Sequence, residues 1–369
     1  MKKILSLILT TAILLSGCAS GGTSSVESKN ENDVASQTEQ KYKGQTLKLY
    51  NWGEYTGEHL IENFEKQTGA KVIIEYFDSN EMMYTKVMAG DKYDILVPSD
   101  YIIEKMLKEK MLMKLDKSKI TNIGNLTEGV KNLSFDPEND YSVPYLWGSV
   151  GIVYNSKNVP EDVVEEKGFS VMKDEKYKGK IYMYDSERDS FMIAFKALGF
   201  STNTENEQEI EKAYQWLVEL NNTMEPIYVT DEVIDGMMNG NKDLAVVYSG
   251  DAAVILDENE DMRFSTPKEG TNIWCDSMVI PANAENPDLA HEFINYVLTY
   301  EASFDNANTV GYASPNDKVL KDMSTGEGIY ADNEAFVPRA GFEKDETFKY
   351  NEILKQKLSE LWIKVKASK

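Results

Sequence analysis

The sequence has few of the residues on which disulfide, metal and nucleophilic chemistry depend. It contains two cysteines, Cys18 and Cys275, and two histidines, His59 and His291. Two cysteines exclude a framework of several disulfides, and neither histidine has the Cys, Asp or Glu spacing of a metal cluster. Cys275 has no neighbouring base to activate it as a nucleophile. We therefore expect no metal and no cofactor, and a fold stabilised by packing alone.

Sequence motifs of the large enzyme classes are also missing. No nucleophile elbow, P-loop, HExxH or dinucleotide-binding fingerprint occurs. Basic residues are outnumbered, with 39 Lys and Arg against 62 Asp and Glu, and the formal net charge is −23. This charge disfavours nucleic acid as a partner and attracts cations. We therefore predict a binding protein that is not an enzyme.

Long apolar runs are confined to the amino terminus. Lys2 and Lys3 precede an apolar run at 4–15, which has the form of a secretory signal peptide. The run is too short to span a bilayer, which takes roughly 20 apolar residues. It ends in Leu-Ser-Gly-Cys at 15–18, which resembles the lipobox of bacterial lipoproteins. The resemblance implies a signal peptide over 1–17 and a lipid on Cys18 that anchors the exported protein to the outer face of the cytoplasmic membrane. The alternative is an ordinary signal peptide that happens to contain a cysteine.

The remaining chain predicts a tether followed by two α/β domains. Residues 19–43 are mostly small and polar, so we predict a flexible tether over 18–43 that begins at the lipidated cysteine. About 325 residues follow, more than one core usually organises. Strand and helix patterns alternate, which predicts α/β lobes with parallel sheets. The predicted strands are 46–50, 71–77, 93–97, 180–184 and 244–248, and the predicted helices are 58–67, 81–88, 206–220, 233–238 and 286–300.

An aromatic residue, a carboxylate or both follow strand after strand. These segments are 51–55, 98–101, 185–189, 248–251 and 274–277. Ligands of open α/β sheets bind outside the carboxyl ends of the strands. Carboxylates bind ammonium groups through charge-assisted hydrogen bonds, and aromatic faces pack on methylenes and attract cations. The pattern predicts a pocket for a rod-shaped cation with an apolar middle, although carboxylates and aromatic platforms also suit a glycosidase.

From residue 44 onward, the chain resembles the spermidine/putrescine-binding proteins of ABC transporters, which are two-lobed periplasmic binding proteins. The stretches that carry the resemblance are NWGEY at 51–55, SNEMMYTKV at 79–87, YDILVPSDY at 93–101, YSVPYLWG at 141–148, IWCDSMVIPANAENP at 273–287 and VGYASPN at 310–316. The resemblance implies one lobe of residues 44–149 and 276–321 and a second of 150–275 and 322–369. Each lobe is then a mostly parallel sheet flanked by helices, with the ligand in the cleft between the lobes.

The same resemblance implies capture of a polyamine, spermidine or putrescine, and its delivery to the membrane subunits of an ABC permease. It also implies a monomer that touches the membrane only through its anchor. The residues that match ligand contacts of the family are Trp52, Tyr55, Ser99, Tyr101, Asp189, Tyr248, Trp274, Asp276 and Tyr312. Among them, Asp276 is expected to bind an ammonium group and Trp274 to cover the carbon chain. Secondary candidates beside them are Glu54, Asp185, Ser186 and Glu187.

The sequence departs from the family at several ligand contacts. Asp189 replaces a glutamate, Tyr248 replaces a tryptophan, and Ser186 stands where the spermidine binder has a second acid. A carboxyl-terminal glutamine contact has no counterpart that can be placed at 342–350. These departures leave the preferred polyamine open, and a sugar or another small cation in the same fold is an alternative.

Three further charged residues near the expected pocket have simpler interpretations. Asp100 and Asp251 each follow a strand, and we expect each to cap the helix that comes next. Arg188 lies among acidic residues and is expected to be an ion-pair partner.

Overall fold

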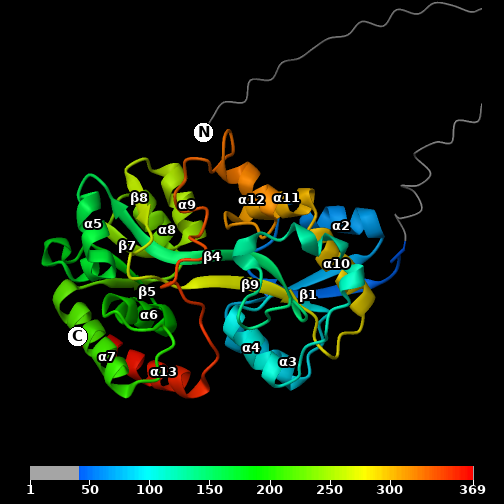
Figure 1. The fold of residues 1–369 in the computed structure, drawn as a ribbon, viewed down its shortest axis with the longest axis horizontal. Helices are drawn as coiled ribbons and strands as arrows, with labels where there is room; N and C mark the ends of the chain where they lie inside the picture. Colours follow the sequence, from blue (N-terminus) through cyan, green and yellow to red (C-terminus); the bar gives the residue numbers. More distant parts are fainter. Residues whose placement is uncertain (1–40, 369) are drawn as a thin grey trace, which may run out of the picture.

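The computed structural model describes residues 41–368 and shows two lobes joined by long strands (Figure 1). The predicted signal peptide, Cys18 and nearly all of the predicted tether lie outside the described residues. Within 41–368, none of the helices combines the length and the apolar character needed to cross a membrane.

Two long strands in the middle of the molecule, β4 (Ser142–Asn155) and β9 (Ile273–Val279), connect the lobes. Residues 142–149 of β4 pair with β9 in antiparallel fashion. Residues 150–155 of β4 pair instead with β7 (Leu244–Tyr248) and β8 (Met262–Ser265). Strand β4 therefore changes partners midway and belongs to the sheets of both lobes, in the strand order β2-β1-β3-β9-β4-β7-β5-β6.

The first lobe contains β1 (Thr46–Trp52), which pairs in parallel with β2 (Lys71–Phe77) and β3 (Ile95–Leu96). Its helices are α2 (Leu60–Thr68), α3 (Asn80–Ala89), α4 (Asp100–Lys108), α10 (Pro287–Val297), α11 (Tyr300–Val310) and α12 (Asp317–Ser324). A core beneath α3 and α4 contains Tyr50 and Tyr93, whose rings stack at 4.4 Å between centroids. Burying such side chains contributes about 1.5–3 kcal/mol each.

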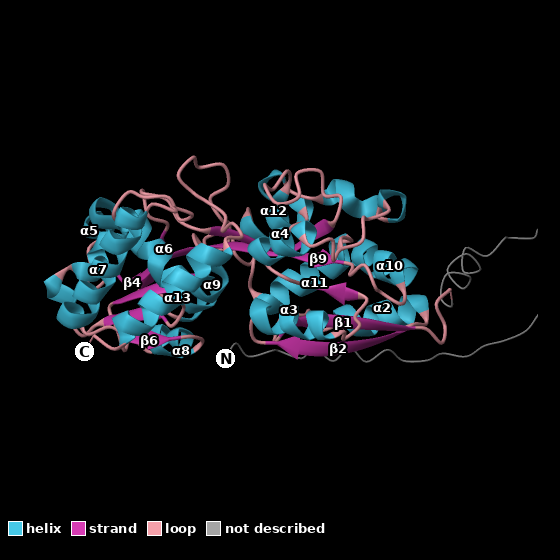
Figure 2. Cartoon of the chain, turned by 90° about the horizontal axis from the view of Figure 1, so that it is seen from below, coloured by secondary structure: helices cyan, strands magenta, loops and turns pink. Residues whose placement is uncertain are grey.

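The second lobe contains β5 (Ile181–Tyr184), which pairs in parallel with β6 (Ile227–Val229) and β7. Its helices are α5 (Glu161–Lys167), α6 (Glu187–Ala197), α7 (Glu207–Met224), α8 (Glu232–Met238), α9 (Ser249–Glu258) and α13 (Glu352–Lys366). Figure 2 shows the strands of each lobe enclosed by helices. Short 3₁₀ turns occupy Lys117–Lys119, Thr121–Asn125, Glu128–Val130, Gly168–Lys173 and Glu175–Tyr177.

The predicted α/β class and the two lobes are confirmed. The outer strands of each lobe are parallel, and the antiparallel pairs arise where β4 and β9 run between the lobes. The predicted end of the helix at 286–300 is wrong, because α10 ends at Val297. The Thr299 hydroxyl then accepts a hydrogen bond from the Ala302 N–H and starts α11, so the segment forms two helices.

Candidate ligand-binding site

The Asp276 carboxylate lies on β9 in the middle of the molecule and is only 7% exposed. Its Oδ2 accepts a hydrogen bond from the Tyr55 hydroxyl at 3.1 Å. The backbone of Ser99 forms an isolated antiparallel bridge with the backbone of Asp276. Burial raises the pKa of Asp276 to about 6, although the hydroxyls of Ser99 and Tyr55 oppose this rise. A positive charge placed beside Asp276 therefore stabilises its ionised form.

Aromatic rings from both lobes gather around Trp274, which precedes Asp276 by two residues and so lies on the same face of β9. The Trp274 ring meets Tyr312 edge to face at 5.1 Å and Tyr248 at 6.2 Å. The Tyr312 ring also lies 6.1 Å from that of Tyr55. We call these four residues the aromatic cluster. Trp274, Tyr248 and Tyr312 are half-buried, and Tyr55 is buried.

Two glycines allow the rings of the aromatic cluster to lie close to the backbone. Gly148 on β4 faces Trp274 across the strand pair, and a methyl group at this position would collide with the indole. A methyl group at Gly250, in the first turn of α9, would collide with the Tyr312 ring. Sequence reasoning did not single out either glycine.

A second acid, Asp189, reaches the aromatic cluster from the start of α6 and is 5% exposed. Its Oδ2 accepts hydrogen bonds from the hydroxyls of Ser186 at 2.7 Å and Tyr248 at 2.8 Å. Burial raises the pKa of Asp189, opposed by these two hydroxyls and by the nearby Arg188. Ser186 is also the helix cap, accepting from the Asp189 N–H, so it fixes the position of this acid.

A third acid, Asp251, belongs to the same group of residues, and its predicted role as a helix cap is wrong. The cap position of α9 is Tyr248, and Asp251 lies in the first turn. The Asp251 carboxylate accepts hydrogen bonds from Tyr312 at 2.8 Å and from Tyr184 at 3.0 Å. Burial raises its pKa to about 6, and the same two hydroxyls oppose this. The signal that could have identified it is the aromatic–acid pattern at 248–251.

The predicted cap role of Asp100 is also wrong, because Ser99 occupies the cap position of α4. Asp100 is 1% exposed, and its Oδ1 accepts from the Tyr101 N–H at 2.6 Å. The pKa of Asp100 is raised to about 8, mainly by burial and in part by the charge of neighbouring Asp276.

Three further predicted contacts, Trp52, Ser99 and Tyr101, are not part of the aromatic cluster. The Trp52 ring packs on Phe77 at 4.5 Å, and its Nε1 donates to the Val97 carbonyl at 2.9 Å. The Asn80 amide donates to the hydroxyls of Ser99 at 3.0 Å and Tyr101 at 3.1 Å. Asn80 therefore fixes two of the predicted contacts.

Three secondary candidates lie away from the aromatic cluster. Asp185 is exposed and pairs with Lys366 at 2.6 Å. Glu187 accepts from the Ser359 hydroxyl at 2.6 Å, and Glu54 is exposed in a loop with φ of 50°.

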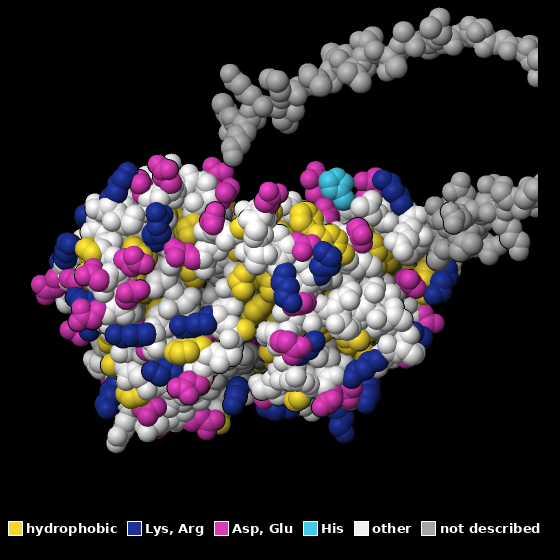
Figure 3. Space-filling model, turned by 45° about the horizontal axis from the view of Figure 1, so that its top comes forward, with side chains coloured by type: hydrophobic (Ala, Val, Ile, Leu, Met, Phe, Trp, Pro, Cys, Tyr) yellow, Lys and Arg dark blue, Asp and Glu magenta, His cyan; other side chains and the backbone are white. Residues whose placement is uncertain are grey.

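A cavity of 220 Å³ lies beside Tyr101, and its lining includes Glu81, Arg188 and Lys355 from the two lobes. Arg188 forms an ion pair with Glu81 at 4.0 Å, which confirms the predicted role of Arg188 as an ion-pair partner. On the face shown in Figure 3, acidic side chains are spread over both lobes and apolar side chains gather between them.

Comparison with known proteins identifies relatives of the whole folded region. Residues 59–336 match the family of bacterial extracellular solute-binding proteins. The chain is 38% identical over 296 residues to the spermidine/putrescine-binding periplasmic protein of Salmonella typhimurium, covering 78% of this chain and 83% of that protein. It is 30% identical over 307 residues to the putrescine-binding periplasmic protein of Escherichia coli, covering 77% and 83%.

Solved structures show the same fold. The substrate-binding protein of a spermidine/putrescine ABC transporter from Streptococcus pneumoniae is 36% identical, with 88% of this chain and 99% of that chain covered and a TM-score of 0.74. A lipoprotein of Treponema pallidum is 27% identical, with 87% and 99% covered and a TM-score of 0.73. The chain therefore belongs to the family of bacterial extracellular solute-binding proteins, in the group that contains the spermidine/putrescine-binding periplasmic proteins.

Proposed function

We propose that the protein captures a polyamine between its lobes and delivers it to the membrane subunits of an ABC permease. One observation carries the proposal. Asp276, Asp189 and Asp251 surround the aromatic cluster, and within residues 41–368 the side chains that donate hydrogen bonds to them are hydroxyls of Ser and Tyr. Acids held in this way favour a ligand that brings its own positive charges. The names of the relatives support this ligand class.

The proposed binding geometry follows from the two lobes. Asp276 of the first lobe receives one ammonium group, and Asp189 of the second lobe receives another. The methylenes between them lie against Trp274 and the neighbouring tyrosine rings, where each cation–aromatic contact adds about 0.5–2 kcal/mol. Asp251 stabilises the arrangement by holding Tyr312. Since a ligand that bridges the lobes excludes water, each charged contact becomes stronger on closure.

The lobe boundaries and the lipid anchor are part of the same proposal. The proposed boundaries are 149/150, 275/276 and 321/322. The change of partners in β4 after residue 149 supports the first, whereas the third falls within α12, which packs in the first lobe. Cys18 attaches the chain to the outer face of the membrane, and the name of the Treponema pallidum relative, a lipoprotein, supports this anchor. We further propose that the protein is a monomer and that it is not an enzyme.

Titration calorimetry with putrescine, cadaverine, spermidine and spermine tests the proposal. We expect saturable binding of at least one of these amines at one site per chain. A set of neutral oligosaccharides serves as the matched control, because sugars share the preference for aromatic platforms and lack the ammonium groups. Binding of a sugar, or its hydrolysis, in the absence of amine binding would overturn the proposal.

A further inference from the structure

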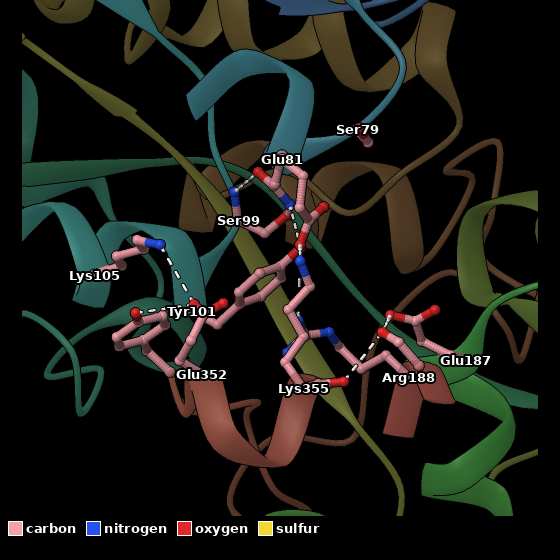
Figure 4. A network of polar contacts seen from close by, with 12 residues as sticks. Ser79, Glu81, Ser99, Tyr101, Lys105, Glu187, Arg188, Glu352 and Lys355 are labelled. Atoms are coloured by element: carbon pink, nitrogen blue, oxygen red, sulfur yellow. Dashed lines mark hydrogen bonds and ion pairs between the residues drawn. The ribbon is translucent and has the colours of Figure 1, made fainter. Parts of the chain in front are cut away.

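Arg188 extends from the second lobe to the first. It lies in the first turn of α6, directly before Asp189, and its guanidinium lies 3.6 Å from the ring centroid of Tyr101 (Figure 4). Its second contact in the first lobe is the ion pair with Glu81 on α3. The side chain of Arg188 is 21% exposed and that of Glu81 is 41% exposed, so water reaches the ion pair from the Glu81 side.

The first lobe holds the receiving groups in a fixed position. The Tyr101 hydroxyl accepts from the Asn80 amide at 3.1 Å and donates to Glu81 at 3.4 Å. A planar guanidinium can stack on such a ring and pair with a carboxylate at the same time, which a lysine ammonium cannot do. Tyr101 and Glu81 thus form the two contacts that the first lobe makes with the Arg188 side chain.

Two further ion pairs join the lobes beside Arg188. Lys355 on α13 pairs with Glu81 at 3.3 Å, and Lys105 on α4 pairs with Glu352 at 3.4 Å and lies 5.1 Å from the Tyr350 ring centroid. Exposed ion pairs contribute little, because water and salt screen them, and Glu352 is 58% exposed. The Arg188 guanidinium lies closer to a ring of the opposite lobe, at 3.6 Å from the Tyr101 centroid, and its planar group stacks there as an ammonium cannot.

Arg188 is also tied to the proposed ammonium site. Asp189 follows it directly, and the Ser186 cap fixes the turn that carries both residues. The Arg188 cation acts on the carboxylates of Asp189, Asp100 and Glu81, and the Lys355 ammonium shares Glu81 with it, so Arg188 is compensated by acids without the ligand.

We infer that Arg188 is a positioning residue that holds the closed cleft over a bound polyamine, by clamping Tyr101 and Glu81 of the opposite lobe. The inference rests on the proposed function. Opening the lobes breaks the clamp, whereas the ammonium contacts at Asp276 and Asp189 do not include Arg188. The clamp therefore acts on the population of the closed form, and the affinity for every polyamine falls by the same factor when it is lost.

Dissociation rates of the complete chain test the clamp. Putrescine and spermidine are used in turn, with tryptophan fluorescence followed by stopped flow. For Arg188→Gln we expect both amines to dissociate about tenfold faster, and for Arg188→Lys an intermediate increase, because the charge is kept and the stacking is lost. Glu81→Gln should act in the same direction with a smaller effect. Arg263→Gln is the matched control, since this exposed arginine bonds only backbone carbonyls of its own segment, and its rates should equal those of the wild type.

Several results would overturn the clamp. These are unchanged dissociation rates in Arg188→Gln, tighter binding as expected for relief of repulsion, or an effect on one amine alone, which would assign Arg188 to a ligand contact. If Arg188→Gln does not fold, as judged by its thermal transition, Glu81→Gln decides by the same criteria. Wild-type protein that binds neither amine would overturn the proposed function itself, whereas normal wild-type binding with unaltered variants would overturn only the clamp.

Discussion

The buried acids at the site carry a cost to stability when no cation is near. The folded-state pKa of Asp276 is about 6 against an ordinary value of 3.8, so the folded chain binds its proton more tightly than the unfolded chain does. The stabilising contribution of the protonated group is complete below pH 3.8 and is lost as the pH rises through 6.

Replacing Asp276 should therefore have opposite effects on binding and on stability. Asp276→Asn should weaken polyamine binding about 100-fold, because an ammonium group loses its charged partner. At pH 7.5 the same variant should raise the unfolding free energy of the ligand-free protein by about 1–3 kcal/mol. Calorimetry and urea denaturation measure the two effects. A variant that is less stable and binds normally would contradict the assigned role.

The raised pKa values also predict how binding depends on pH. Asp276, with a pKa of about 6, accepts a proton as the pH falls and then attracts an ammonium group less. The dissociation constant should be nearly constant above pH 7 and should rise below pH 6, by up to about tenfold per pH unit. Titrations between pH 5 and 8 measure this. A dissociation constant that does not change over this range would show that Asp276 does not face the ligand.

Single residues also mark where sequence reasoning was insufficient. Asp251 was interpreted from its neighbours alone, as a helix cap, but its partners Tyr312 and Tyr184 lie 61 and 67 positions away. Asp185 and Glu187 lie beside Asp189 in the sequence, yet they point toward Lys366 and Ser359. Local sequence identifies such residues as candidates, and only the fold decides which of them face the aromatic cluster.

At the level of the element, the strand patterns were highly informative and the helix ends less so. The predicted strand 244–248 coincides with β7, an apolar run that is buried up to its last residue. The predicted strand 71–77 coincides with β2, an edge strand whose residues are mostly exposed or half-buried. Gly69 ends α2 in the left-handed conformation, close to the end of the predicted helix at 67. The break between α10 and α11 was missed, because the apolar pattern continues across Thr299 while its hydroxyl caps the next helix.

The start of α9 provides a prediction at this level. Gly250→Ala should weaken polyamine binding about tenfold, because the new methyl group pushes the Tyr312 ring out of the aromatic cluster. The helix itself should persist, since alanine favours helix more than glycine does. Gly124→Ala is the matched control, as a methyl group there meets no atom within 4 Å. Calorimetry compares the two variants, and equal affinities would show that Tyr312 does not touch the ligand.

At the level of the whole molecule, residues from both lobes meet in one site. Tyr55 and Asp276 come from the first lobe, and Asp189, Tyr248 and Asp251 come from the second. The two-lobed class could be predicted because several motifs occur in the order of a known family. The contacts that close the cleft could not, because Arg188 and Tyr101 lie far apart in the chain and no pattern in the sequence pairs them.

A ligand that binds both lobes should stabilise the entire chain. At a spermidine concentration of 100 times the dissociation constant, the folded state gains about 2.7 kcal/mol, which raises the melting temperature by several degrees. Differential scanning calorimetry measures the shift. Asp276→Asn should remove most of it at the same concentration. An equal shift in this variant would indicate nonspecific stabilisation by a polycation.

The exchange of partners along β4 has a mechanical consequence. Next to the point of exchange, Gly148 faces Trp274 on β9, and Asp276 follows two residues later on the same strand. In the proposed binding mechanism, the backbone that bends when the lobes separate also carries Trp274 and Asp276. Opening of the lobes and release of the ligand are then a single movement, because a hinge at this position cannot rotate without displacing Trp274 and Asp276.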